Sequence, residues 1–131
     1  MGFFSNLFKK TTTEVQFEQV EHDGQIVLEN QNDRLTNFSD VDLEMFLDAM
    51  FEDEDQFVTL TLPKASFGIR YVQACQVDDG LNVQLGIEEN EHTNLVEKMC
   101  SAEECLDIFM QFYDTGMVSD LKAYTPVEFF R

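Results

Sequence analysis

The sequence predicts an α+β domain: a single twisted antiparallel sheet of about five to six strands with two long helices packed on one face, plus a short amphipathic helix at the amino terminus. Two observations support this fold class. Between residues 57 and 99, apolar and polar side chains alternate with a period of two, which is typical of strands with one buried face. Two segments flanking this region place apolar residues at helical spacing behind strong helix start signals.

The first long helix is predicted from Ser39 to about Phe51. Ser39 is a suitable N-cap, and Asp42 stands three residues later, at the spacing of a capping box. Phe38 is placed to pack against Leu43 as a hydrophobic staple. The expected buried stripe consists of Leu43, Phe46, Leu47 and Met50.

The segment ahead of this helix predicts a β-hairpin. Its two strands are expected over residues 15–21 and 25–29, joined at His22-Asp23-Gly24, because Asp-Gly is a strong signal for a tight turn. The polar stretch over residues 30–37 is expected to be a loop.

The segment between the helices predicts a meander of strands. These strands are expected at residues 57–62, 67–77, 81–87 and 95–99. The connections are expected at residues 63–66, 78–80 and 88–94. In the second strand Phe67, Ile69, Tyr71, Cys75 and Val77 are expected on one face, with only Gln73 breaking the alternation.

The second helix is predicted from Ala102 to about Thr115, with Ser101 as N-cap, Glu104 at the capping-box position and Gly116 as the stop signal. We expect it to be the central core helix. Its wide apolar arc consists of Ala102, Cys105, Leu106, Phe109, Phe112 and Tyr113. The tail, residues 121–131, is expected to add an edge strand that ends at Pro126.

Length and composition fit one folded domain. The chain has 131 residues, of which 44% are hydrophobic, including 13 Phe, and this content argues against intrinsic disorder. We expect residues 1–13 to form a short amphipathic segment and tether, and residues 14–131 to form a single α+β domain.

The amino-terminal segment is a candidate anchor. Its apolar side chains fall on one side of a short helix, at Phe3, Phe4, Leu7 and Phe8. The alternatives are contact with lipid or a protein, a frayed terminus, or packing against the chain's own domain, since ten residues form only a marginal helix in water.

The net charge of −18 restricts the partners. It argues against direct binding to nucleic-acid phosphates and to anionic membrane surfaces, and no apolar run is long enough to span a bilayer. Three cysteines without C-x-x-C spacing do not suggest a disulfide framework. We therefore expect a cytoplasmic protein with reduced thiols.

No catalytic motif is present, so we expect a protein that is not an enzyme and needs no cofactor or metal. His22 and His92 fall in expected loops. The acidic run at residues 52–55 lacks the glycine and distal glutamate of an EF-hand loop, which favours a solvated helix end over a calcium site. A weaker divalent-ion candidate is the loop set Glu88, Glu89, Glu91 and His92.

Cys100 and Cys105 occupy the N′ and N4 positions of the second helix, which meet in a hydrophobic staple. Apolar packing is the expected role of both side chains. The alternative is a redox or soft-metal contact.

One surface of the first helix is unusually acidic. Asp40, Glu44, Asp48 and Glu52 recur every four residues, which stacks them in one stripe about 6 Å apart. Each like-charged pair destabilises the helix by roughly 0.2–0.5 kcal/mol. Apolar side chains also point to this side. The candidate partner-binding residues are Asp40, Val41, Glu44, Met45, Asp48, Glu52, Asp53, Glu54 and Asp55.

The leading hypothesis is a non-catalytic acidic intracellular protein that docks onto a basic protein, as an immunity protein or nucleic-acid mimic does when it inhibits a toxin or nuclease. This similarity is one of size, charge and layout, because no motif identifies a family. One alternative is an acidic homodimer of the secretion-chaperone type. Another is a small-ligand or enzymatic domain with a site between the sheet and the second helix, lined by Arg70, Tyr71, Gln73 and Tyr113.

Overall fold

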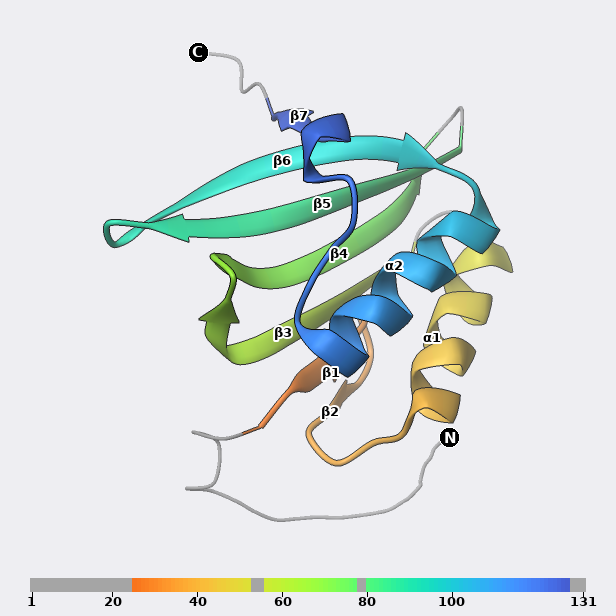
Figure 1. Ribbon diagram of the computed structural model, residues 1–131. Helices are drawn as coiled ribbons and strands as arrows, with labels where there is room; N and C mark the ends of the chain where they lie inside the picture. The colour runs from red at the N-terminus through yellow and green to blue at the C-terminus, as the bar shows by residue number, and fades with distance from the viewer. Residues whose placement is uncertain (1–24, 53–55, 78–79, 128–131) are drawn as a thin grey trace.

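The computed structural model describes residues 25–52, 56–77 and 80–127. They form an α+β fold in which one antiparallel sheet carries two long helices on one face, as predicted (Figure 1). The sheet has seven strands, more than the five or six expected, in the order β2-β1-β3-β4-β5-β6-β7. The predicted amino-terminal helix lies outside the described residues.

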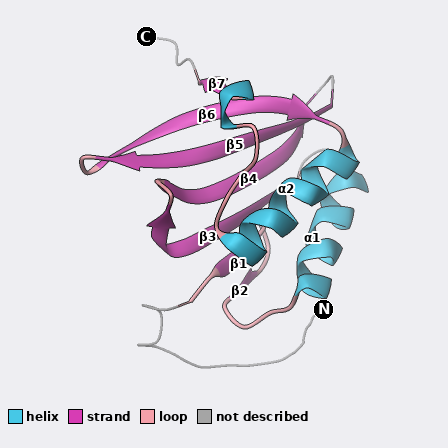
Figure 2. Cartoon of the chain, viewed as in Figure 1, coloured by secondary structure: helices cyan, strands magenta, loops and turns pink. Residues whose placement is uncertain are grey.

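The elements follow one another along the chain as two short strands, a helix, a four-strand meander, a second helix and a short tail (Figure 2). The strands are β1 (Val27–Glu29), β2 (Arg34–Leu35), β3 (Phe57–Ser66), β4 (Ile69–Val77), β5 (Gly80–Glu89), β6 (His92–Cys100) and β7 (Thr125–Pro126). The helices are α1 (Asp40–Glu52), α2 (Ala102–Thr115) and the 3-10 turn η2 (Leu121–Ala123). Within the described ranges, no helix is both long enough and apolar enough to cross a membrane.

The core lies between the helices and the sheet. Both α1 and α2 pack against it, and they also contact each other. From α1 the fully buried side chains are Leu43, Leu47 and Met50, while Phe46 of the predicted stripe is only partly buried. From α2 the buried side chains are Cys105, Ile108, Phe109 and Phe112, whereas Ala102 of the predicted arc is exposed.

The start of α1 confirms the predicted capping box. The Ser39 backbone N–H donates to Asp42 Oδ2 at 2.9 Å, and the Asp42 N–H donates to Ser39 Oγ at 3.5 Å. Phe38 has a partner that the sequence did not suggest: its ring lies 5.4 Å from the Tyr113 ring, and its carbonyl accepts a hydrogen bond from Tyr113 Oη. The entry to α1 is therefore fixed to α2.

A side chain from the sheet holds the other end of α1. The helix has no basic residue in its last turn, so its final carbonyls need other donors. The Gln76 amide on β4 donates to the Met50 carbonyl at 3.0 Å and also to the Phe51 carbonyl. Both ends of α1 are thus tied to the rest of the domain.

The caps of α2 also agree with the sequence. Ser101 Oγ accepts from the Glu104 N–H at 3.1 Å. Gly116 adopts φ 74°, and its N–H donates to the Phe112 carbonyl at 2.8 Å. A positive φ of this kind strongly favours glycine.

The region ahead of α1 differs from the prediction. Residues 15–24 of the expected hairpin lie outside the described residues, and the strand at 25–29 is shorter, as β1. The expected loop at 30–37 contains the strand β2, which pairs with β1. Asn30 makes this turn possible because its Oδ1 accepts from the N–H groups of Asn32 and Asp33 at 2.9 and 2.8 Å.

Two predicted connections in the meander are wrong. β3 continues through residues 63–66, and the chain turns instead at Phe67-Gly68, where both residues have positive φ. The expected loop at 88–94 is a two-residue turn at Asn90-Glu91, with φ of 48° and 72°. Such hairpin turns usually carry glycine, so the dipeptide gave no turn signal.

A β-bulge reverses the predicted faces of β4. Ile69 pairs with Ile87, but Tyr71 pairs with Gly86, so two residues on β4 oppose one on β5. Beyond the bulge Val72 and Ala74 point into the core. The side chains that face away from the helices are therefore those of Tyr71, Gln73 and Cys75, with Val77 at the strand end. The sequence pattern had instead predicted Tyr71 and Cys75 on the same face as Ile69.

The tail closes the sheet as predicted, at Pro126. After η2, β7 pairs with β6 through Val96 and Glu97. The Val127 N–H donates to the Leu95 carbonyl at 2.9 Å and continues the pairing by one residue.

The face of the sheet opposite α1 and α2 is called the helix-free face, because no helix of the described residues packs on it; there, Tyr71 covers Gly86. A Cβ atom at Gly86 would lie 2.3 Å from Tyr71 Cε2, so any side chain there displaces the ring. We expect Gly86→Ala to lower the free energy of unfolding by about 1 kcal/mol, through overpacking, in urea denaturation.

The matched control is Gly86→Ala in a Tyr71→Ala background. There the clash is absent, and the substitution should be neutral or stabilising because alanine restricts the unfolded chain. An equal cost in both backgrounds would contradict this account of the Tyr71–Gly86 contact.

Candidate functional site

The outward side of α1 presents the surface that the sequence singled out. Val41 and Met45 are apolar, yet they are 61% and 58% exposed. The same helix carries four exposed acidic side chains. We call this surface the acidic helix face; it consists of Asp40, Val41, Glu44, Met45, Asp48 and Glu52. The predicted extension at Asp53, Glu54 and Asp55 lies outside the described residues, as does the proposed anchor at Phe3, Phe4, Leu7 and Phe8.

The acidic helix face follows from the burial of the opposite side of α1. Leu43, Leu47 and Met50 are held in the core, so the positions between them must face solvent. Asp42 is the exception among the acids, because its carboxylate accepts the capping hydrogen bonds. Its role is structural, and it does not belong to the face.

Charge is segregated between the two layers of the fold. α1 contains five acidic residues and α2 four, and neither helix contains Lys or Arg. The Lys and Arg residues within the described ranges all lie in strands or in η2: Arg34, Lys64, Arg70, Lys98 and Lys122. α2 adds the exposed acids Glu103, Asp107 and Asp114 to the helix layer. This segregation is visible in the sequence, because residues 40–52 and 102–115 contain neither Lys nor Arg.

The ion pairs of the described residues do not neutralise α1. They join Arg34 to Glu29 at 4.0 Å, Arg70 to Glu88 at 2.9 Å, and Lys98 to Glu104 at 2.5 Å. None of these pairs includes a carboxylate of α1. The carboxylates of α1 therefore form no ion pair with Lys, Arg or His among the residues that the structure describes.

The structure does not assemble the ligand site expected between the sheet and α2. Tyr71 and Gln73 lie on the helix-free face, where Gln73 Oε1 accepts from Thr59 Oγ1 at 2.9 Å. Tyr113 lies on the other side of the sheet, with its hydroxyl donating to the Phe38 carbonyl at 3.2 Å. The bulge in β4 causes this separation, so these side chains do not converge.

The acidic loop set is also dispersed. Glu88 pairs with Arg70, and Glu89 Oε1 accepts from Asn94 Nδ2 at 3.2 Å. Across residues 25–52, 56–77 and 80–127, no three His, Cys, Asp or Glu side chains are grouped so that they could hold a metal ion.

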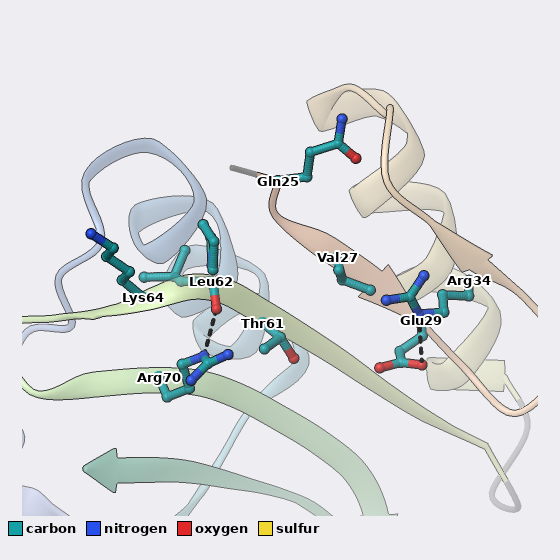
Figure 3. A pocket seen from close by; sticks show the side chains of 9 residues that line it. Gln25, Val27, Glu29, Arg34, Thr61, Leu62, Lys64 and Arg70 are labelled. Atoms are coloured by element: carbon teal, nitrogen blue, oxygen red, sulfur yellow. Dashed lines mark hydrogen bonds and ion pairs between the residues drawn. The ribbon is translucent and has the colours of Figure 1, made fainter. Parts of the chain in front are cut away.

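A pocket of about 610 Å³ lies beside β1 and β3, and it was not foreseen from the sequence (Figure 3). Arg34, Lys64 and Arg70 line it together with Glu29. Two of these cations are already paired with carboxylates, Arg34 with Glu29 and Arg70 with Glu88 at 2.9 Å. Arg70 Nε also donates to the Leu62 carbonyl at 2.6 Å. The pocket therefore has little uncompensated positive charge with which to hold an anion.

A second cluster of reactive groups lies where β6 joins α2. Cys100 ends β6 and is half-buried, while Cys105 in the first turn of α2 is fully buried. Cys100 pairs with the buried Leu81 and so faces the helix side of the sheet, and both cysteines pack at the core, as the predicted staple positions require. Lys98 points to the same side, with Nζ 2.5 Å from Glu104 Oε2 and 5.1 Å from the centre of the Tyr124 ring. We call Lys98, Cys100, Glu104, Cys105 and Tyr124 the thiol cluster.

The two cysteines of the thiol cluster have pKa values shifted in opposite directions. The hydrogen bond from Cys105 lowers the pKa of Cys100, with a further contribution from the Lys98 charge, against the opposing effects of burial and Glu104. The same hydrogen bond and burial raise the pKa of Cys105 strongly. Burial also raises the pKa of Tyr124, so its hydroxyl keeps its proton. Cys100 is therefore the sulfur that ionises first.

The ion pair inside the cluster can be tested for its part in stability. Lys98 is only 14% exposed, so its ammonium depends on the Glu104 carboxylate. We expect Glu104→Gln to lower the free energy of unfolding by about 1 kcal/mol in urea denaturation at neutral pH. Glu103→Gln is the matched control, because Glu103 lies in the same helical turn but is exposed. Equal costs for both variants would show that the helix dipole, and not the ion pair, is responsible.

Comparison with known proteins does not assign this chain to a family. The chain matches no protein-family model, no curated protein and no solved structure.

Proposed function

We propose that this protein is a non-catalytic acidic binding protein of the cytoplasm that docks onto a basic protein through the acidic helix face. The partner class is a cationic protein such as a toxin or nuclease, which an immunity protein or nucleic-acid mimic inhibits by covering its cationic surface. The observation that carries the proposal is the exposure of Val41 and Met45 among the carboxylates of α1.

The two kinds of side chain on this face have different roles in docking. Carboxylates steer a cationic partner and fix its orientation, and they act mainly on the association rate. Met45 and Val41 supply the apolar centre, which is desolvated in the complex and slows dissociation. A surface that carries only carboxylates lacks such an apolar centre. A helix face that is simply solvated has no need of exposed apolar side chains.

The architecture favours a rigid docking surface. α1 is tied to α2 by the Tyr113–Phe38 hydrogen bond and to β4 by Gln76. A helix held at both ends loses little conformational freedom on binding, which favours affinity. The partner is expected to present Lys and Arg around an apolar contact.

The first test is affinity capture from native cell extract with a charge-reversed bait. Asp48→Lys with Glu52→Lys should reduce recovery of a basic protein severely, because the partner meets like charge. The matched control is Glu89→Lys with Glu91→Lys, which changes the net charge equally at the β5–β6 turn, away from the helices. A partner lost from the α1 variant and retained by the control supports the proposal.

Equal losses in both variants would show a response to net charge only and would overturn the α1 site. Recovery of the bait alone at low salt would also count against a constitutive partner. A bait that sediments as a homodimer and retains an unfolded client after charge reversal would favour the chaperone-type alternative.

The apolar centre gives a separate prediction, which is measured on the captured partner by surface plasmon resonance. Met45→Ser should weaken binding about tenfold or more, mainly through faster dissociation, and the loss should persist at high salt. Salt screens the contribution of the carboxylates instead. Ala49→Ser on the same exposed helix is the control. An unchanged dissociation rate for Met45→Ser would remove the apolar contact from the proposal.

A further inference from the structure

The two cysteines at the β6–α2 junction have different surroundings from the third cysteine of the chain. Cys100 immediately precedes the N-cap Ser101, Cys105 follows Ser101 by four residues in the first turn of α2, and both side chains pack into the core on the helix side of the sheet. Cys75 lies on β4 and faces the opposite side, away from both. Cys75 is therefore an internal reference thiol in the same chain.

The surroundings of Cys100 favour its thiolate form. Interaction with the Cys105 thiol and the Lys98 charge lower the pKa of Cys100, and the positive end of the α2 dipole begins at the next residue. Cys100 is half-buried and so accessible to a small reagent, whereas Cys105 is 0% exposed. One thiol is placed to react with solvent and the other to react only with its neighbour.

Tyr124 provides an independent observation at this cluster. Its side chain is 7% exposed, and Tyr124 Oη is the buried side-chain polar atom that lacks a hydrogen-bond partner in the described part of the chain. A buried hydroxyl without an acceptor is costly and calls for an explanation. Both cysteines lie close enough to Tyr124 to act electrostatically on its hydroxyl. An oxygen atom added to a sulfur of this cluster supplies the kind of acceptor that the hydroxyl lacks.

We propose that Cys100 and Cys105 form a peroxide-reactive pair, in which Cys100 is oxidised first and Cys105 then closes an intrachain disulfide. The Cys100 thiolate attacks one oxygen of hydrogen peroxide, the O–O bond breaks, and hydroxide leaves; Cys100 becomes a sulfenic acid and the peroxide is reduced. The Cys105 sulfur then attacks the Cys100 sulfur. The S–S bond forms, the S–O bond breaks, and the departing hydroxide takes the Cys105 proton as water.

This inference does not depend on the proposed docking function. The thiol cluster and the acidic helix face share no residue, so either can fail without the other. Tyr124 is assigned as a positioning residue, which donates to the oxygen on Cys100 before the disulfide closes.

The test uses the full-length reduced protein, treated with hydrogen peroxide at neutral pH and followed by peptide mass spectrometry. We expect a Cys100–Cys105 disulfide, with Cys75 still reduced. With iodoacetamide in place of peroxide, Cys100 should react about tenfold or more faster than Cys75, because Cys75 has its pKa raised by burial. Cys75→Ser should leave disulfide formation unchanged. Oxidation of Cys75 at the rate of Cys100 overturns the proposal.

The order of the two steps is tested with single variants. Cys105→Ser and Cys105→Ala should stop at the sulfenic acid on Cys100, trapped as its dimedone adduct, and Cys100→Ser should give neither product. Two replacements at Cys105 guard against a misfolded core, and circular dichroism checks each one. No dimedone adduct in a folded Cys105 variant overturns the order.

The role of Tyr124 has its own readout. Tyr124→Phe should shorten the lifetime of the Cys100 sulfenic acid in the Cys105→Ala background while leaving the alkylation rate of Cys100 within about twofold. A merely structural role would change both rates together, and that result would overturn the positioning assignment.

Discussion

Burial of one face of the antiparallel sheet beneath α1 and α2 is the constraint on which the rest of the structure depends. The inward side chains of β3, β4 and β5 form a continuous apolar surface, and within the described chain these two helices cover it. Each helix must therefore turn its apolar stripe inward, and all other helical positions must face solvent. The exposure of acidic residues on both helices is therefore a consequence of how the helices pack on the sheet, and it does not require a binding partner to explain it.

This arrangement explains how a strongly acidic chain folds with few compensating charges. Most carboxylates of the helix layer stand in water, where repulsion between them is screened. Glu104 differs from the other acids of α2 because it pairs with Lys98, which faces inward and is 14% exposed. The fold thus combines a largely solvated acidic layer with a partly buried ion pair beside the thiols.

The helices were predictable from the sequence because their signals are local. Ser39 with Asp42, and Ser101 with Glu104 and Gly116, specify where each helix begins or ends within one turn of chain. The strand faces were less predictable: the break in alternation at Gln73 was the only local sign of the register shift between Ile69 and Tyr71, and it did not locate the bulge. The exposure of Val41 and Met45 followed from helical periodicity. The meeting of Tyr124 with the two cysteines joins the tail to the β6–α2 junction, and no local pattern encodes such a long-range contact.

The two ends of the sheet limit how this protein can associate. The outermost strands, β2 and β7, are two residues long, and β7 includes Pro126, which has no N–H to offer a further strand. Next to β7, β6 carries the charged side chain of Lys98, which faces inward and pairs with Glu104. Growth of the sheet by edge-to-edge pairing is therefore obstructed at both ends. In the described chain, the broad surfaces of the fold therefore offer more area for association than the outermost strands β2 and β7 do.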